Sequence, residues 1–191
     1  MNVRSLIVGA AIAMAPIAVQ AQLGIYVNPI ATRVSNSVAD SGLYAFLGQN
    51  SKSAIFYGVN FGAYYDFKSS LPFHAGLDMR DSIQHGNGAA LNEFLTGVRI
   101  SMPFKHLKPY IEPVVGAGTT RAPFTALHVT RVEYGVLGGI DYATHHHIDF
   151  RLIELGYTNL VTASSETIGA NATIPASDLI TFSAGIVFRF P

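Results

Sequence analysis

The sequence predicts an all-β fold, an eight-stranded antiparallel up-and-down transmembrane β-barrel, on three observations. Apolar and polar residues alternate with period two in several stretches; between 133 and 142, Glu133, Gly139 and Asp141 share one face. No helical pattern follows residue 21 that could cover the apolar faces. Short and long connections alternate between the stretches. An apolar exterior, a polar interior and such connections are typical of barrels that cross a lipid bilayer.

The N-terminal segment predicts export. Arg4 precedes an apolar run from Leu6 to Val19, and Ala21 precedes a predicted cut before Gln22. This arrangement is typical of a secretory signal, and the run is shorter than the about 20 apolar residues of a spanning helix. We therefore expect residues 1–21 to be a cleaved signal peptide and residues 22–191 to be one outer-membrane β-barrel domain. The alternative is a buried N-terminal helix.

The composition excludes some functions. Lys and Arg together number 12, as do Asp and Glu, so the net charge is zero. Nucleic-acid-binding domains usually carry a basic excess, and no nucleic-acid partner is expected. The chain has no cysteine, which excludes thiol catalysis and cysteine-ligated metals.

The strands are predicted from alternation bounded by turn residues. In chain order they span 24–33, 54–66, 73–83, 92–103, 110–120, 131–143, 148–160 and 179–190.

The connections predict the orientation in the membrane. Short turns are expected at 67–72, 104–109 and 144–147, and longer loops at 34–53, 84–91, 121–130 and 161–178. Outer-membrane barrels place short turns in the periplasm and long loops outside the cell. We therefore expect Ser35–Lys52 and Thr162–Ser177 at the cell surface, and His145–His147 in the periplasm.

The two faces of each strand predict its surroundings. Apolar residues expected to point to lipid near the bilayer middle are Phe61, Val98, Val136 and Ile186. In the seventh strand, Asp149 and Arg151 share a face that Glu154 does not. A β-bulge near Leu152–Ile153 would turn all three inward, and we predict one there.

Charged residues on the inward faces predict a closed lumen. Eight strands leave room only for side chains, so we expect an ion-pair network to fill the interior. Its predicted members are Asp78, Arg80, Glu93, Arg99, Glu112, Arg131, Glu133, Asp141, Asp149, Arg151, Glu154 and Arg189. The lysines, in contrast, are expected outside the strands, at 52, 68, 105 and 108.

Two contacts in this network are predicted by counting outwards from the turns. Arg99 and Glu112 are expected to lie nearly opposite each other, where opposite charges stabilise strand pairing. Asp141 is expected opposite Asp149, and two such acids repel unless a cation lies between them. We expect Arg151, or the inward arginine of the last strand, to bridge the two acids.

The chain resembles the small outer-membrane β-barrel proteins of the OmpA/OmpX-like class. The likeness is carried by Pro109–Gly118 (PYIEPVVGAG), Gly135–Tyr142 (GVLGGIDY) and Ile148–Tyr157 (IDFRLIELGY), and it extends over 22–191. It implies a monomer in the lipid of a bacterial outer membrane. In such proteins the assembly machinery reads an aromatic residue that ends the last strand, and Phe190 stands at that position here.

Two groups of residues contain side chains of the types that bind metals or catalyse reactions. Three adjacent histidines, His145–His147, rarely converge on one ion, so a solvated turn is favoured over a metal site. The loop residues His128, Thr130 and Ser164–Glu166 form neither a His-x-Ser pair nor a nucleophile elbow. We expect no catalytic, metal or cofactor site and no enzymatic activity.

The function expected from these observations is a structural or surface-interaction role, through extracellular loops that contact an unidentified ligand. One alternative is a small porin that passes ions or small solutes. A second is an outer-membrane enzyme that modifies lipid.

Overall fold

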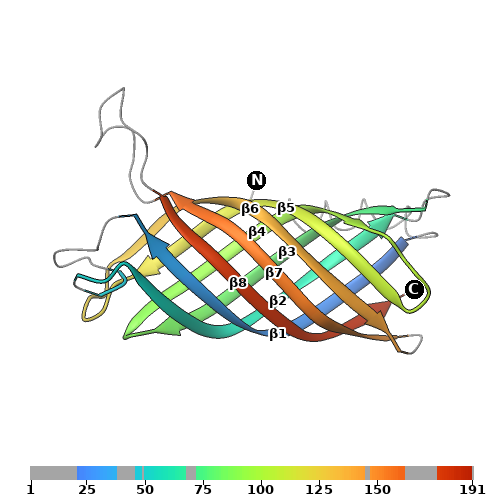
Figure 1. Ribbon diagram of the computed structural model, residues 1–191, viewed down its shortest axis with the longest axis horizontal. Coiled ribbons are helices and arrows are strands. Elements are labelled where there is room, and N and C mark those ends of the chain that lie inside the picture. Colours follow the sequence, from blue (N-terminus) through green and yellow to red (C-terminus); the bar gives the residue numbers. More distant parts are fainter. Residues whose placement is uncertain are drawn as a thin grey trace, which may run out of the picture.

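The computed structural model is a closed barrel of eight strands, in which each strand pairs antiparallel with the next and β8 pairs with β1 (Figure 1). It describes residues 21–37, 46–48, 50–67, 72–144, 147–161 and 176–190. The strands are β1 Ala21–Asn36, β2 Ser53–Phe67, β3 His74–Gly86, β4 Ala89–Ser101, β5 Leu107–Arg121, β6 His128–Ala143, β7 Ile148–Val161 and β8 Ala176–Phe190. The predicted fold class is confirmed. The predicted signal peptide, apart from its last residue, lies outside the described residues.

The connections define two ends of the barrel. At the turn end, β1 begins, β8 ends, and β2–β3, β4–β5 and β6–β7 are joined (Figure 1). At the loop end, the other four connections join β1–β2, β3–β4, β5–β6 and β7–β8. Among the described residues, no helix is long and apolar enough to cross a membrane.

The connection between β3 and β4 is shorter than predicted. The two strands continue to Gly86 and Ala89, so the loop expected at 84–91 is wrong. Both residues of the turn have positive φ, 52° at Asn87 and 78° at Gly88. Asn-Gly is the pair that two-residue hairpin turns of this kind favour, because Asn tolerates positive φ and Gly adopts it without steric cost.

The turn between β4 and β5 also ends earlier than predicted. Phe104 and Leu107 exchange backbone hydrogen bonds of 2.6 and 2.9 Å around Lys105, whose φ is 55°. Strand β5 therefore begins at Leu107 and contains Lys108. The prediction that this lysine lies outside the strands is wrong.

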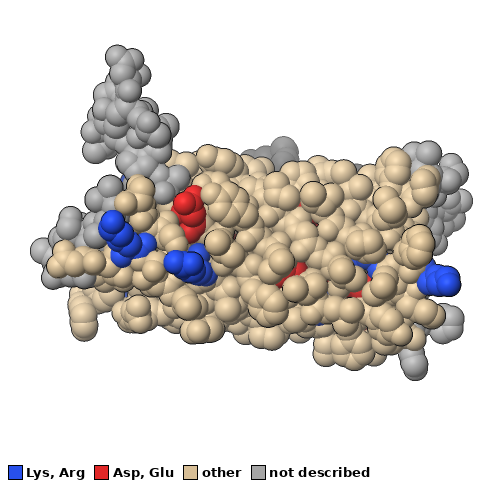
Figure 2. Space-filling model, in the orientation of Figure 1, with Lys and Arg blue, Asp and Glu red and all other residues tan. Residues whose placement is uncertain are grey.

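Alternation along the strands gives the barrel an apolar outer wall. The residues predicted to point outwards are 37% to 46% exposed, and that orientation is confirmed for Phe61, Val98, Val136 and Ile186. On the face drawn in Figure 2, charged atoms gather towards the two ends, and only small areas of charge interrupt the wall between them. A wall of this kind is stable in lipid, where a closed sheet leaves no backbone group unpaired.

The β-bulge predicted in β7 is confirmed. The register shifts between Ile140 and Asp141 of β6 against β7, and between Arg151 and Glu154 against β8. Asp149, Arg151 and Glu154 are all buried as a result. One extra residue in the strand thus brings three charges onto the same inward face.

Candidate functional site in the barrel lumen

The lumen gathers charged side chains from strands that are not neighbours in the sheet. Arg80 of β3 lies at its centre, and Nη2 of Arg80 is 2.9 Å from Oε2 of Glu112 on β5. Nη1 of Arg80 is 2.9 Å from Oε1 of Glu154 on β7. Its Nε lies 3.2 Å from Oδ1 of Asp78, two residues earlier on β3. One guanidinium, 5% exposed, thus joins three strands across the barrel.

Two further arginines extend the network towards the turn end. Arg151 reaches Asp141 with Nε at 2.9 Å and Glu154 with Nη1 at 3.1 Å. Arg99 places Nη2 2.7 Å from Oδ2 of Asp141 and Nε 3.9 Å from Oδ1 of Asp66. Asp141 and Glu154 therefore each contact two arginines, which compensates the cost of burying these carboxylates.

The predicted contact between Arg99 and Glu112 is absent from the ion pairs of the described residues. Backbone register sets their neighbours Ile100 and Ile111 opposite each other, so the predicted near-opposition of Arg99 and Glu112 on adjacent strands is confirmed. The side chains diverge, however, because Arg99 pairs with Asp141 and Glu112 pairs with Arg80. In a narrow closed barrel, a long side chain reaches across the lumen as easily as it reaches the adjacent strand.

The predicted opposition of Asp141 and Asp149, in contrast, is wrong. Backbone pairing sets Ala143 opposite Asp149, and beyond the bulge it sets Asp141 opposite Arg151. Asp149 instead lies 2.7 Å from Nε of Arg189 and 3.0 Å from Nζ of Lys108. In the ion pairs of the described residues, Asp141 contacts Arg99 and Arg151, whereas Asp149 contacts Arg189 and Lys108.

Three tyrosines that the sequence analysis did not include complete the network. Tyr26 donates to Oδ1 of Asp78 at 2.8 Å, and Tyr110 donates to Oε2 of Glu154 at 2.5 Å. The guanidinium carbon of Arg99 lies 3.6 Å from the centre of the Tyr110 ring and 4.3 Å from that of Tyr64. Stacking on aromatic rings stabilises a buried guanidinium beyond its ion pairs.

Glycines make room for these rings. A Cβ at Gly139 would lie 2.5 Å from the hydroxyl of Tyr110, and one at Gly24 would lie 2.3 Å from the Tyr64 ring. Alternation does place Tyr110 on the same face as Glu112. This spacing of two residues is the signal by which the sequence could have assigned Tyr110 to the lumen.

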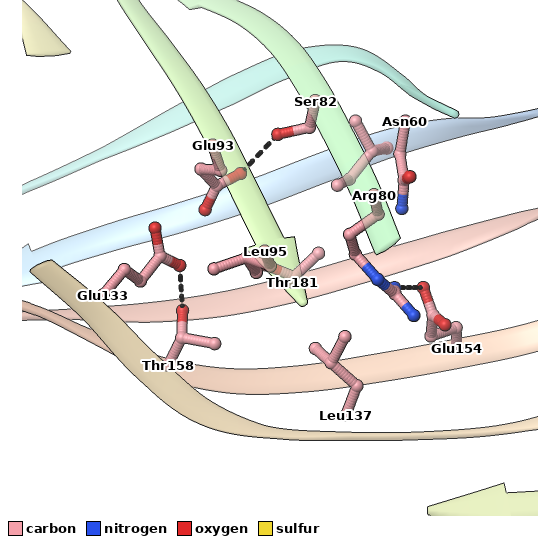
Figure 3. Close-up of a pocket in the computed structure, with 11 residues that line it drawn as sticks. Asn60, Arg80, Ser82, Glu93, Leu95, Glu133, Leu137, Glu154, Thr158 and Thr181 are labelled. Carbon is pink, nitrogen blue, oxygen red and sulfur yellow. Dashed lines mark hydrogen bonds and ion pairs between the residues drawn. The ribbon is translucent and has the colours of Figure 1, made fainter. Parts of the chain in front are cut away.

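Closer to the loop end lie two further acids of the lumen, neither of which takes part in the ion pairs of the described residues. Glu93 accepts hydrogen bonds from Ser82 at 2.6 Å and from Gln84, and Glu133 accepts one from Thr158 at 2.8 Å. Both acids line a cavity of about 20 Å³ that also touches the Arg80 network (Figure 3). A cavity of this size holds about one water molecule.

An apolar cluster fills the lumen at the loop end. Its buried residues are Val34, Leu47, Ala54, Phe56, Ala89, Leu91, Leu160 and Leu179. Leu47 comes from the connection between β1 and β2, and its neighbour Phe46 stacks on Phe56 with ring centres 4.9 Å apart. Part of the first loop thus folds over the barrel interior.

The remaining predicted residues lie outside this interior or beyond the described chain. Arg131 is exposed and donates to the carbonyl of Thr130 at 3.3 Å, so its inclusion in the lumen is wrong. His128 is exposed at the loop end. His145, His146 and Ser164–Glu166 lie outside the described residues. Within the described ranges, no three His, Asp or Glu residues are grouped to hold a metal ion.

Comparison with known proteins identifies the fold. No family model and no curated protein matches the chain. The neisserial surface protein A structure has a TM-score of 0.57 and 15% identity, over 88% of this chain and 97% of that one. The attachment invasion locus protein Ail of Yersinia pestis has a TM-score of 0.51 and 9% identity, over 90% and 99% respectively. The resemblance to small OmpA/OmpX-like outer-membrane barrels is confirmed at the level of the fold.

Proposed function

We propose that this chain is an integral β-barrel protein of the bacterial outer membrane, with a structural or surface-interaction role carried by its loop end. In this proposal residues 1–21 are removed on export, and the assembly machinery reads the end of β8 at Phe190. The mature protein is a monomer with its lumen closed to solutes. The apolar outer wall and the shared fold support the membrane location.

One observation carries the closed lumen. Arg80 contacts carboxylates from β3, β5 and β7, so its ion pairs cross the barrel from wall to wall. Arg99 and Arg151 add a second level, and the apolar cluster fills the loop end. A solute passing along the axis would have to displace buried, paired charges, and stranding one such charge typically costs about 3–5 kcal/mol.

Conductance in a planar bilayer tests the closed lumen. The folded wild-type protein should show no steady single-channel current. The variant Arg80→Ala should show intermittent current if it inserts, because it removes the residue that joins three walls. Arg131→Ala, at the exposed loop end, serves as the matched control and should behave as wild type. A large, stable current from wild type would refute the closed lumen and favour the small porin.

Labelling of intact cells tests the location and the orientation. An epitope inserted between Ala126 and Leu127, in the β5–β6 connection, should bind antibody on intact cells. The same epitope in the β4–β5 turn, next to Lys105, should bind only after the outer membrane is permeabilised. The reverse pattern would overturn the orientation. A lipid-turnover assay on the purified protein tests the enzyme alternative.

A further inference from the structure

The lipid-facing wall carries one acid away from its ends. On β3 the outward residues Leu77, Met79 and Ile83 are strongly exposed, and Asp81 lies half-buried between Met79 and Ile83. Strand register places Phe61 of β2 on one side of Asp81 and Phe94 of β4 on the other. An ionisable side chain in such apolar surroundings is costly, and it marks a functional site by default.

The position of Asp81 separates it from the other outward charges. On the described strands, the other outward charges and outward histidines lie within the last few positions at the loop end: Arg33, His85, Arg121, His128, Asp178 and the exposed Arg131. Asp81 lies further towards the middle of the wall, and within the described residues its carboxylate forms neither a hydrogen bond nor an ion pair. No residue that the structure describes therefore compensates the acid.

A hollow in the outer wall adjoins this acid. It has a volume of about 420 Å³, and its lining includes Ile25, Phe61, Met79, Phe94 and Asp81. Small side chains explain the hollow, since Gly62 and Ala63 also line it between these larger residues. The hollow is open on its outer side, so an occupant would lie along the wall and would not be enclosed.

A second acceptor lies on the same outward face as the acid. Asn92 of β4 pairs with Ile83, so it is diagonal to Asp81 on the same outward face, at a typical separation of about 7–8 Å. Its Oδ1 is buried and has no hydrogen-bond partner in the described chain. Of these two acceptors Asp81 alone lines the hollow, and a carboxylate beside an apolar hollow suits a cation attached to an apolar chain.

We propose that this hollow binds an amphiphile with a primary ammonium head group from within the membrane. The ammonium pairs with the Asp81 carboxylate. The alkyl chain lies along Ile25, Phe61 and Met79. A second copy of the chain is disfavoured as the occupant, because a two-fold contact through this wall would bring two Asp81 carboxylates together.

The chain has no tryptophan, so one introduced residue reports on the site alone. Phe94→Trp places the reporter in the hollow, and Phe182→Trp places a matched reporter on the outward face of β8. Folded protein in phosphatidylcholine vesicles is titrated with hexadecylamine carrying a nitroxide on its chain. The same titration is repeated with the equally labelled hexadecanol, which lacks the charge.

At the Phe94→Trp reporter, the amine should quench tryptophan fluorescence with an apparent affinity about tenfold higher than that of the alcohol. A hydrogen bond to a charged group contributes enough free energy for a ratio of this size. Asp81→Asn should abolish this preference, and Asp178→Asn, at the loop end, should leave it unchanged. A heat-modifiability gel verifies that each variant is folded.

Three results would overturn the proposal. The first is equal quenching by amine and alcohol in the hollow. The second is the same preference at the Phe182→Trp reporter, which would indicate a general attraction of cations to the protein. The third is Asp81-dependent crosslinking of two chains without amine binding, which would identify a second copy as the occupant.

Discussion

At the scale of single residues, the contribution of each lumen charge depends on how many partners it joins. Arg80 contacts three carboxylates, whereas Arg131 contacts a backbone carbonyl at the exposed loop end. Removing Arg80 takes the paired cation from the buried carboxylates of Glu112 and Asp78, and it takes one of two arginines from Glu154. Removing Arg131 leaves no buried charge unpaired.

We therefore expect Arg80→Ala to lower the free energy of unfolding by about 3–5 kcal/mol. Arg131→Ala should change it by about 0.5 kcal/mol or less. Urea unfolding of the protein in lipid vesicles, followed by the shift on a heat-modifiability gel, measures both. A double-mutant cycle with Glu154→Gln isolates the coupling of the two side chains, and a coupling energy near zero would contradict their direct pairing.

The sequence predicted which residues face the lumen better than it predicted their partners. Whether a side chain points inwards or outwards follows from the alternation along its own strand, which is a local property. This alternation places Arg99, Glu112 and Asp141 on inward faces. Partners depend on closure of the barrel, which brings β3, β5 and β7 together although they are not adjacent in the sheet. Counting from a turn cannot find the contact between Arg80 and Glu154, because it relates only neighbouring strands.

At the scale of elements, the bulge in β7 brings Glu154 onto the same inward face as Asp149 and Arg151, although strict alternation would place it on the opposite face. Leu152 and Ile153 together occupy the place of one residue between Arg151 and Glu154. The sequence revealed this bulge because charges on both sides of it fell on opposite faces. The β3–β4 turn was not predicted from the sequence, because the polar residues on both sides of Asn87–Gly88 suggested a longer loop. Asn-Gly is itself a strong signal for a two-residue hairpin turn.

Deletions in β7 test the role of the bulge. Removing Leu152 restores strict alternation and keeps Asp149, Arg151 and Glu154 inward, so the deletion should leave most of the protein folded. Removing Leu155 should largely prevent folding, because a one-residue slip turns every later side chain of β7 to the other face. Folded fractions on a heat-modifiability gel compare the two deletions. Equal losses of folded protein in the two deletion variants would show that Leu152 is not an extra residue that β7 can lose.

At the scale of the whole molecule, the barrel reverses the usual distribution of polarity. Buried residues include many charged and polar side chains, and the outward faces carry the large apolar ones. This inversion is stable only where the surroundings are apolar and the sheet has no open edge. Both conditions were predictable, because alternation without covering helices indicates them together.

The last prediction tests the depth of the wall in the membrane. Val98 is 46% exposed and points outwards in β4, between the two ends of the barrel. Thr119 also points outwards, opposite Thr130 near the loop end of β5. Arg costs about 2–4 kcal/mol at the bilayer midplane of such barrels and about 0–1 kcal/mol near the interfaces. Val98→Arg should therefore lower the folded fraction in vesicles far more than Thr119→Arg does, and equal losses would mean that Val98 does not lie in the apolar core of the membrane.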